Sequence, residues 1–437
     1  MSPPDTTLDG LLTAAQTAVD AAYALHDEYN GPLAEKPKRV AAAHSAALAA
    51  VAACEAAQSE ADDPSWDKHA LQARLYYLRG KAIASTEEGR LSDEAERLLA
   101  DAVKLKPSLN DAWNCLGECF WERGELDTAR HTFHGALEHE RTCATLCHLS
   151  MLLRMSSLAT GHREDSLLLE SVMLAKEAAR LEPSNANAWK GLGTAHLTVH
   201  LNATSAAEDL HMANRAFTQA GKLMATADTA IHAGLCMDHS VVKVLLDQHD
   251  EYFRLLTEAH TLDSTLGADE KREHGWLYVV QICDAIAAKR DAFDRGEAKH
   301  KKMINSLAEL GTPTCLLSQL TLGENPGRTV MVKVVLSVPQ TGMRIQTGTK
   351  MVIVADQNAD LMAVTIYALR GVAPFEPGTT LELKEPSLLR IEAAKTWAAS
   401  PTGDGKPMTA GFHLLRIESP STHLKVNGHG LQPVRRR

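Results

Sequence analysis

The 437-residue sequence lacks the features of a secreted or membrane-spanning chain. Its first ten residues, MSPPDTTLDG, contain neither a basic start nor an apolar run, so we expect no signal peptide. The most apolar stretch, residues 41–57, is mostly alanine and includes His44, Ser45 and Glu55, which favours a soluble helix over a membrane span. Eight scattered cysteines form no disulfide framework, which indicates a reducing compartment. We therefore expect a cytoplasmic protein without a membrane partner.

Motifs of catalysis and cofactor binding are lacking as well. The sequence contains no nucleophile elbow, no phosphate-binding loop, no H-E-x-x-H motif and no paired-carboxylate signature. Cys115 and Cys119 form a C-x3-C pair, as do Cys143 and Cys147, but the first pair lies one turn apart in a helix where small buried thiols are common. The sequence therefore predicts a protein that is not an enzyme and has neither a cofactor nor a metal site.

Charge is distributed unevenly along the chain. Residues 1–298 carry 28 basic and 45 acidic side chains, whereas residues 299–437 carry 17 basic and 10 acidic ones. An acidic surface repels nucleic acid, so nucleic acid is not expected as a ligand of the first part. The opposite net charges suggest different partners for the two parts.

Residues 111–140 contain large and small side chains at fixed offsets. Seven positions define this pattern: Trp113, Leu116, Gly117, Phe120, Ala129, Phe133 and Ala136. Glycine and alanine stand where two antiparallel helices touch, and the large residues fill the groove to the neighbouring helices. All seven match the tetratricopeptide repeat, which predicts a helical hairpin of this type.

Less regular units of the same kind flank this hairpin. One begins at Trp189, and an eroded unit runs over residues 228–262. We predict an all-α tetratricopeptide superhelix over residues 71–298 with enlarged turns. Residues 1–70 are expected to form a helical cap, and residues 269–293 a long helix that closes the other end, because terminal repeats must cover their apolar face.

The composition changes near residue 311 from alanine and glutamate to valine, threonine, glycine and proline. A basic linker is predicted at 299–312, a β-domain at 313–426 and a disordered tail at 427–437. Five short strands are predicted in the β-domain: 330–338, 350–355, 361–369, 380–383 and 411–417. Their number and spacing favour a small five-stranded β-barrel of the oligonucleotide/oligosaccharide-binding type, although an SH3-like barrel or a sandwich would give a similar pattern.

Few aromatic residues are available for such a barrel to bind single-stranded nucleic acid. Stacking on bases requires exposed aromatic rings on the strands. The candidates are Tyr367, Phe375, Trp397 and Phe412, and two of them fall in predicted loops. A structural or protein-binding barrel is therefore favoured, with single-stranded nucleic-acid binding as an alternative.

The order of these parts and several segments resemble the tetratricopeptide repeat protein 5 family. The likeness is close over residues 98–193, looser over 228–310 and mainly architectural over 1–70. The segments that carry it are residues 99–139, LSMLLRMSSL at 149–158, VMLAKEAARLEPSNANAWKGLG at 172–193, VKVVLSV at 332–338 and LKVNG at 424–428.

The resemblance implies an adaptor whose helical array binds the N-terminal Met-Arg-Glu peptide of α- and β-tubulin as it emerges from the ribosome. Such an adaptor recruits mRNA-decay adaptor proteins, so that surplus tubulin reduces its own synthesis. The resemblance also implies a second role, as a nuclear scaffold for transcriptional coactivators, and thus a location in the nucleus besides the cytoplasm.

Two residues are candidates for peptide binding. Arg154 follows Ser150 by one helical turn, which places it on the inner face of its hairpin, and it matches the family's peptide-contacting arginine in LSMLLR. A guanidinium there offers several donors to a carboxylate or a peptide carbonyl. The resemblance further implies that Asp228 pairs with the arginine of the peptide, although an acidic cap at a helix start is the alternative.

Three lysines are candidates for contact with the ribosome. Lys299, Lys301 and Lys302 lie where the chain changes from acidic to basic, and they match the family's ribosome-contacting segment. Lysines bind rRNA phosphates without reading sequence, which gives a weak, salt-sensitive interaction. The alternative is a solvated linker or helix end.

Overall fold

A computed structural model describes most of the chain, in nine segments. These are residues 7–27, 36–60, 67–159, 165–224, 229–308, 315–339, 349–369, 375–395 and 408–431. The chain divides into two compact units. Unit 1 comprises residues 1–195 and 223–231, and unit 2 comprises residues 196–222 and 232–437. Each unit is described by itself.

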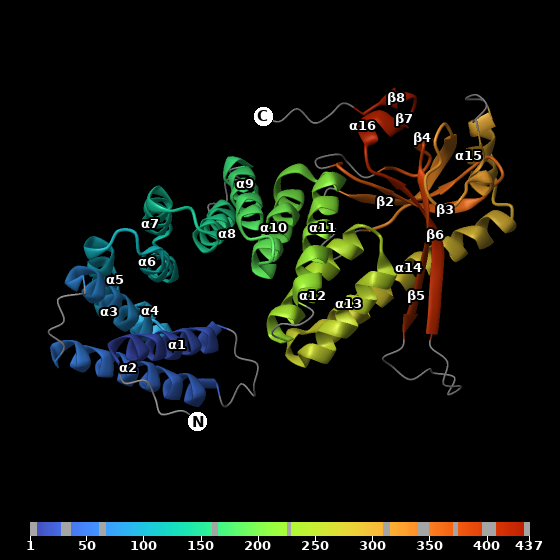
Figure 1. The fold of residues 1–437 in the computed structure, drawn as a ribbon. Helices are drawn as coiled ribbons and strands as arrows, with labels where there is room; N and C mark the ends of the chain where they lie inside the picture. Colours follow the sequence, from blue (N-terminus) through green and yellow to red (C-terminus); the bar gives the residue numbers. More distant parts are fainter. Residues whose placement is uncertain are drawn as a thin grey trace. The chain divides into compact units, whose positions relative to one another are not determined.

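Unit 1 is helical and its helices pack in consecutive pairs (Figure 1). Its helices are α1 (Leu8–Asp27), α2 (Lys36–Glu60), α3 (Lys68–Ile83), α4 (Glu87–Arg90), α5 (Asp93–Leu105), α6 (Asn110–Glu122), α7 (Leu126–His139), α8 (Cys143–Ala159), α9 (Asp165–Leu181) and the start of α10 (Ala186–Val199). The pairs are α1 with α2, α3 with α5, α6 with α7 and α8 with α9. The short helix α4 fills the enlarged turn that the sequence predicted between α3 and α5, and Thr86 caps its first turn.

The α6–α7 hairpin shows why the repeat pattern needs its residues. The ring of Phe133 is fully buried, and a Cβ added at Gly117 would lie 2.6 Å from Phe133 Cε1. Glycine at 117 is therefore required for the two helices to approach around this ring. Trp113 Nε1 donates to Pro107 O at 2.8 Å, and Trp189 Nε1 repeats this bond to Pro183 O at 2.8 Å. The same hydrogen bond thus occurs at the start of both hairpins, which confirms the predicted helical repeat.

Helix α2 is the one described helix that passes a length-and-composition test for a membrane span. Its residues Lys36–Gln58 have a mean hydropathy of 1.5, and 22% of the window is buried. Ala47, Val51 and Cys54 belong to the core shared with α1 and α3. One such helix is weak evidence for a membrane, since core helices pass the same test.

Unit 2 combines helices with one β-sheet. Its helical elements are a π-helical turn (His200–Thr204), α11 (Ala207–Met224), α12 (Thr229–Leu245), α13 (His249–Leu262), a 3-10 turn (Ser264–Leu266), α14 (Ala268–Asp294), α15 (Ala298–Ala308), a second 3-10 turn (Leu317–Gln319) and α16 (Pro420–His423). Its strands are β1 (Thr329–Ser337), β2 (Lys350–Ala355), β3 (Leu361–Ile366), β4 (Thr380–Lys384), β5 (Ser387–Lys395), β6 (Met408–Ile417), β7 (Leu424–Val426) and β8 (His429–Gly430).

The sheet differs from the predicted barrel in its number of strands. It has eight strands in the order β5-β6-β3-β2-β1-β4-β7-β8, so the predicted count of five is wrong. The end strands β5 and β8 do not pair with each other within the described residues, and the oligonucleotide/oligosaccharide-binding type of barrel stays a prediction. All the pairings are antiparallel except that of β3 with β6. The short strand β8 lies within the segment 427–437 that was predicted to be disordered.

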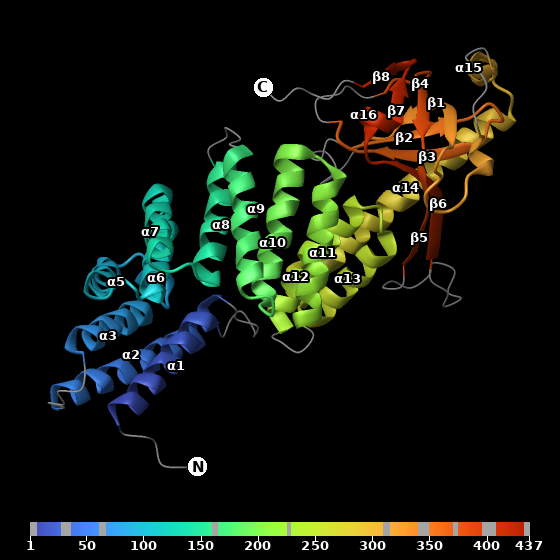
Figure 2. The same cartoon turned by 45° about the horizontal axis from the view of Figure 1, so that its top comes forward.

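Helices α13 and α14 pack against the sheet of unit 2 (Figure 1 and Figure 2). Phe253 and Trp276 share one buried core with Ile353 and Leu414. The hydroxyl of Tyr367 donates to Leu245 O and, at 2.9 Å, to Asp247 Oδ2. The last helices and the sheet therefore form one compact body, although the sequence assigned them to separate domains at 71–298 and 313–426.

Candidate functional site

Helix α8 carries an apolar stripe that is open to solvent. Met151 and Met155 are each 46% exposed and Leu158 is 53% exposed. Residues three and four apart lie on one helix face, so Arg154 stands within the same stripe. Contiguous exposed apolar side chains are typical of a surface that binds another molecule. We call Met151, Arg154, Met155 and Leu158 the α8 stripe.

The guanidinium of Arg154 is held at the base of the α8 stripe. Arg154 is 8% exposed, and its Nη1 donates to Ser150 Oγ at 2.8 Å. Ser150 Oγ in turn donates to Ser171 O of α9 at 2.8 Å. This chain of bonds fixes the arginine relative to both helices of the hairpin. Its contact with a peptide stays a prediction.

A cavity of about 360 Å³ adjoins the α8 stripe within unit 1. Its lining residues come from α4, α6 and α8: Arg90, Glu118, Trp121, Glu122, Cys147, His148 and Met151. Met151 belongs to both the cavity and the stripe. The cavity therefore offers an aromatic ring and two carboxylates beside an apolar surface.

Glu118 is the centre of a polar network in this cavity. It accepts a hydrogen bond from the Tyr23 hydroxyl and lies 3.0 Å from His148 Nδ1. Burial opposes its ionisation, but the charge and hydrogen bond of His148, together with Tyr23 and Arg90, hold the pKa of Glu118 below its ordinary value. Burial likewise opposes the charge of His148, and Glu118 outweighs it, so the pKa of His148 is raised. Each side chain thus favours the charged form of the other.

The sequence-predicted residues are not all brought together. Asp228 lies outside the described residues. The backbones of Lys299, Lys301 and Lys302 are in α15, which packs against β1, so most of the predicted linker at 299–312 is helical. Lys301 and Lys302 are exposed, as contact with a ribosome requires, but they belong to unit 2 and Arg154 to unit 1.

The aromatic residues considered for base stacking are mostly buried. Tyr367, Phe375 and Phe412 are 0%, 6% and 8% exposed. Trp397 lies outside the described residues. Because stacking requires an accessible ring face, these three rings offer no platform for nucleic-acid bases.

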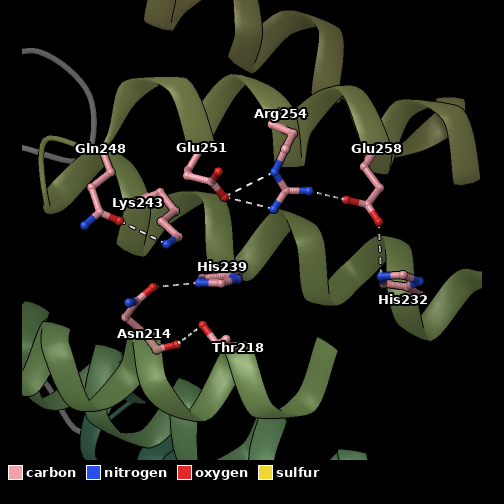
Figure 3. Close-up of polar contacts among 9 residues, drawn as sticks. All are labelled: Asn214, Thr218, His232, His239, Lys243, Gln248, Glu251, Arg254 and Glu258. Atoms are coloured by element: carbon pink, nitrogen blue, oxygen red, sulfur yellow. Dashed lines mark hydrogen bonds and ion pairs between the residues drawn. The ribbon is translucent and has the colours of Figure 1, made fainter. Parts of the chain in front are cut away.

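Unit 2 contains a polar cluster between α11, α12 and α13 that sequence reasoning missed (Figure 3). Arg254 bridges two carboxylates of its own helix, at 2.9 Å to Glu251 and 2.9 Å to Glu258. Lys243 Nζ donates to Gln248 Oε1 at 3.0 Å. These contacts are local in sequence, whereas those of His239 with Asn214 and of His232 with Glu258 join different helices and depend on how the helices pack.

His239 lies at the centre of this cluster and is held uncharged. Burial lowers the pKa of His239 to about 4, and the positive charges of Lys243 and Arg254 add to the effect. His239 is 7% exposed, and its Nε2 lies 2.8 Å from Asn214 Oδ1 of α11. A neutral imidazole that donates from Nε2 satisfies this bond.

The helical hairpins and the exposed α8 stripe define a tetratricopeptide repeat protein, a class that binds peptides and partner proteins. No family model matches the chain. Tetratricopeptide repeat protein 5 of Mus musculus is 28% identical over 380 residues, which cover 82% of this chain and 81% of the relative. The Homo sapiens protein is 27% identical over 378 residues, covering 82% and 80%. This similarity over most of both chains supports membership of the tetratricopeptide repeat protein 5 family.

Solved structures align less closely. YrrB, described as a tetratricopeptide protein with an unusual peptide-binding site, is 15% identical and covers 48% of this chain, with 94% of its own chain matched and a TM-score of 0.34. PilW, a type IV pilus biogenesis factor, is 12% identical, with 57% and 93% covered and a TM-score of 0.37. These scores support no comparison of site geometry. The family relation indicates an adaptor that acts through protein interaction.

Proposed function

We propose that the protein binds the N-terminal Met-Arg-Glu peptide of nascent α- and β-tubulin at the ribosome and triggers decay of the tubulin mRNA. The observation that carries this proposal is the α8 stripe, in which an anchored guanidinium lies among exposed methionine and leucine side chains. The similarity to tetratricopeptide repeat protein 5 also supports this proposal. The protein acts in the cytoplasm on this proposal, because tubulin is translated there.

The chemistry of unit 1 suits each residue of this peptide. Met151 and Met155 form a flexible apolar surface for the first methionine of the peptide. Arg154 complements the glutamate, and Glu122, which is 53% exposed, complements the arginine together with the predicted Asp228. Each charge-assisted hydrogen bond contributes roughly 1.5–3 kcal/mol. Two such bonds and a buried methionine account for a micromolar complex, about −8 kcal/mol.

Substituting Arg154 is expected to weaken peptide binding by about 10- to 100-fold, the equivalent of one charge-assisted hydrogen bond. The measurement is fluorescence anisotropy of a labelled tubulin N-terminal peptide titrated with the full chain, comparing wild type with Arg154→Ala. A peptide with the arginine and glutamate exchanged serves as the ligand control.

Arg141→Ala is the matched protein control. Arg141 also lies in unit 1 and forms a bidentate ion pair with Glu177 at 2.7 Å, but its side chain is 51% exposed and it is outside the α8 stripe. Its loss should leave the dissociation constant unchanged. Equal affinity of wild type and Arg154→Ala would contradict the assignment of this site.

The exposed lysines of α15 are expected to support ribosome contact through charge. The double variant Lys301→Glu/Lys302→Glu should reduce co-sedimentation with ribosomes at least several-fold, and the loss should be largest at low salt because the contact releases counterions. Lys384→Glu reverses one such charge at a side chain 41% exposed elsewhere in unit 2 and should have little effect. Unchanged co-sedimentation of the double variant would remove α15 from the ribosome contact while leaving the peptide site untouched.

A further inference from the structure

Three metal-ligating side chains meet between α12 and α13 in unit 2. His232 and Cys236 are four residues apart on α12, so both face the same side of the helix. Glu258 reaches this point from α13. The imidazole nitrogen, the thiol sulfur and a carboxylate oxygen all lie within 4.8 Å of one another. Among the described residues, no other group of three histidine, cysteine or acidic side chains is this close.

We propose that His232, Cys236 and Glu258 form a binding site for a zinc ion, which goes beyond the function proposed above. The first support is the spacing of the donor atoms. Zinc binds nitrogen and oxygen at about 2.0–2.2 Å, so two such ligands of a tetrahedral ion lie about 3.4 Å apart. The distance from His232 Nε2 to Glu258 Oε1 is 3.4 Å. It is longer than the 2.9 Å ion pair that Glu258 forms with Arg254.

The second support is the way in which Glu258 is held. Arg254 Nη1 donates to Glu258 Oε2 at 2.9 Å, which leaves Oε1 directed at His232 (Figure 3). Outer partners of this kind fix the orientation of a ligating carboxylate. Arg254 also binds Glu251 at 2.9 Å, so one guanidinium is shared by two carboxylates. Negative charge therefore remains beside the three donors, which favours a cation.

The donor set identifies zinc rather than magnesium or calcium. Thiolate and imidazole are preferred ligands of zinc, whereas magnesium and calcium prefer oxygen donors. Three protein ligands leave a fourth coordination position. The side chains of His232 and Glu258 are 20% and 35% exposed, so a water molecule and the incoming ion can reach this position. The bound ion would join α12 to α13 and stabilise the hairpin.

The test is a titration of the reduced full chain with Co²⁺, which replaces zinc and reports its ligands by absorption. A tetrahedral cobalt ion with a thiolate ligand gives an intense charge-transfer band. We expect one equivalent of Co²⁺ to give this band and Zn²⁺ to abolish it by displacement. A weak spectrum typical of octahedral cobalt, or no band, would overturn the proposal.

Variants decide which residues hold the ion. Cys236→Ser should abolish the charge-transfer band, and His232→Gln should weaken Co²⁺ binding at least tenfold. The matched control is Cys283→Ser, because Cys283 is a free thiol of the same unit that lies on α14, outside the cluster. If Cys236→Ser fails to fold because Cys236 is buried, His232→Gln still tests whether the cluster holds the ion. A band that persists in both cluster variants, or that is lost in Cys283→Ser, would place the ion elsewhere and overturn the assignment.

Discussion

Replacing Phe133 by alanine is expected to lower the free energy of unfolding of unit 1 by about 3–5 kcal/mol. The side chain is 0% exposed and fills the space between α6 and α7 directly above Gly117. Removing the ring takes away its transfer free energy from water, and the rigid backbone around Gly117 limits how far the cavity can collapse. The loss is therefore expected near the upper part of the range for buried aromatic residues.

A double-mutant cycle with Gly117 separates this packing from other effects. Gly117→Ala alone forces a methyl group to 2.6 Å from Phe133 Cε1, an overpacking that costs roughly 1–3 kcal/mol. In the Phe133→Ala background the same methyl group enters empty space, so Gly117→Ala should be neutral or should stabilise by about 1 kcal/mol through helix propensity. The difference between the two backgrounds is the coupling energy of the contact.

Gly191→Ala provides the control for helix propensity. Gly191 is also inside a helix, α10, but a Cβ at that position has no neighbouring atom within 4 Å. Alanine there should stabilise by about 1 kcal/mol. Native-state hydrogen exchange of α6 and α7 amides measures the free energies locally. Equal effects of Gly117→Ala in both backgrounds would show that the ring and the glycine are not coupled.

The repeat could be predicted because its signal is steric and local. Gly117, Ala129 and Phe133 stand at fixed offsets, and the structure buries Ala129 fully and packs the ring of Phe133 against Gly117. Strand β5 could not be predicted in this way. Its sequence, SLLRIEAAK, contains alanine, glutamate and lysine, which favour helices, and it follows Pro386. Its alternating burial arises from pairing with β6 and packing against α13, neither of which is local in sequence.

The same division between local and non-local signals applies to the candidate sites. Arg154 was predicted from one helical offset and a resemblance. The structure places it, 8% exposed, at the base of the α8 stripe, and its contact with a peptide stays a prediction. The pair of Glu118 with His148 and the set of His232, Cys236 and Glu258 were missed. In both, at least one partner comes from another helix, and the spacing in sequence matches no motif. Only the way in which neighbouring helices dock brings these side chains together.

Unit 2 is expected to lose about 3 kcal/mol of stability between pH 6.5 and pH 4 through His239 alone. The pKa of His239 is about 4 in the folded protein, because burial and then the charges of Lys243 and Arg254 disfavour the imidazolium. In the unfolded chain it returns to about 6.5. Between these values the unfolded state binds more protons than the folded state, so the free energy of unfolding rises with pH. The contribution is complete above pH 6.5 and is lost as the pH falls to 4.

Comparing His239→Gln with wild type across this range isolates the effect from all other titrating groups. A glutamine amide can still donate to Asn214 Oδ1, which lies 2.8 Å from His239 Nε2, but it takes up no proton. The wild-type advantage should therefore shrink steadily as the pH falls, when measured by hydrogen exchange in α11–α13. Lys243→Met should reduce the pH dependence without removing it, because one of the charges that oppose protonation is lost while burial remains. A difference between wild type and His239→Gln that is constant from pH 4 to 7 would show that the imidazole titrates normally in the folded protein, and that the packing of α11 on α12 does not exclude its charge.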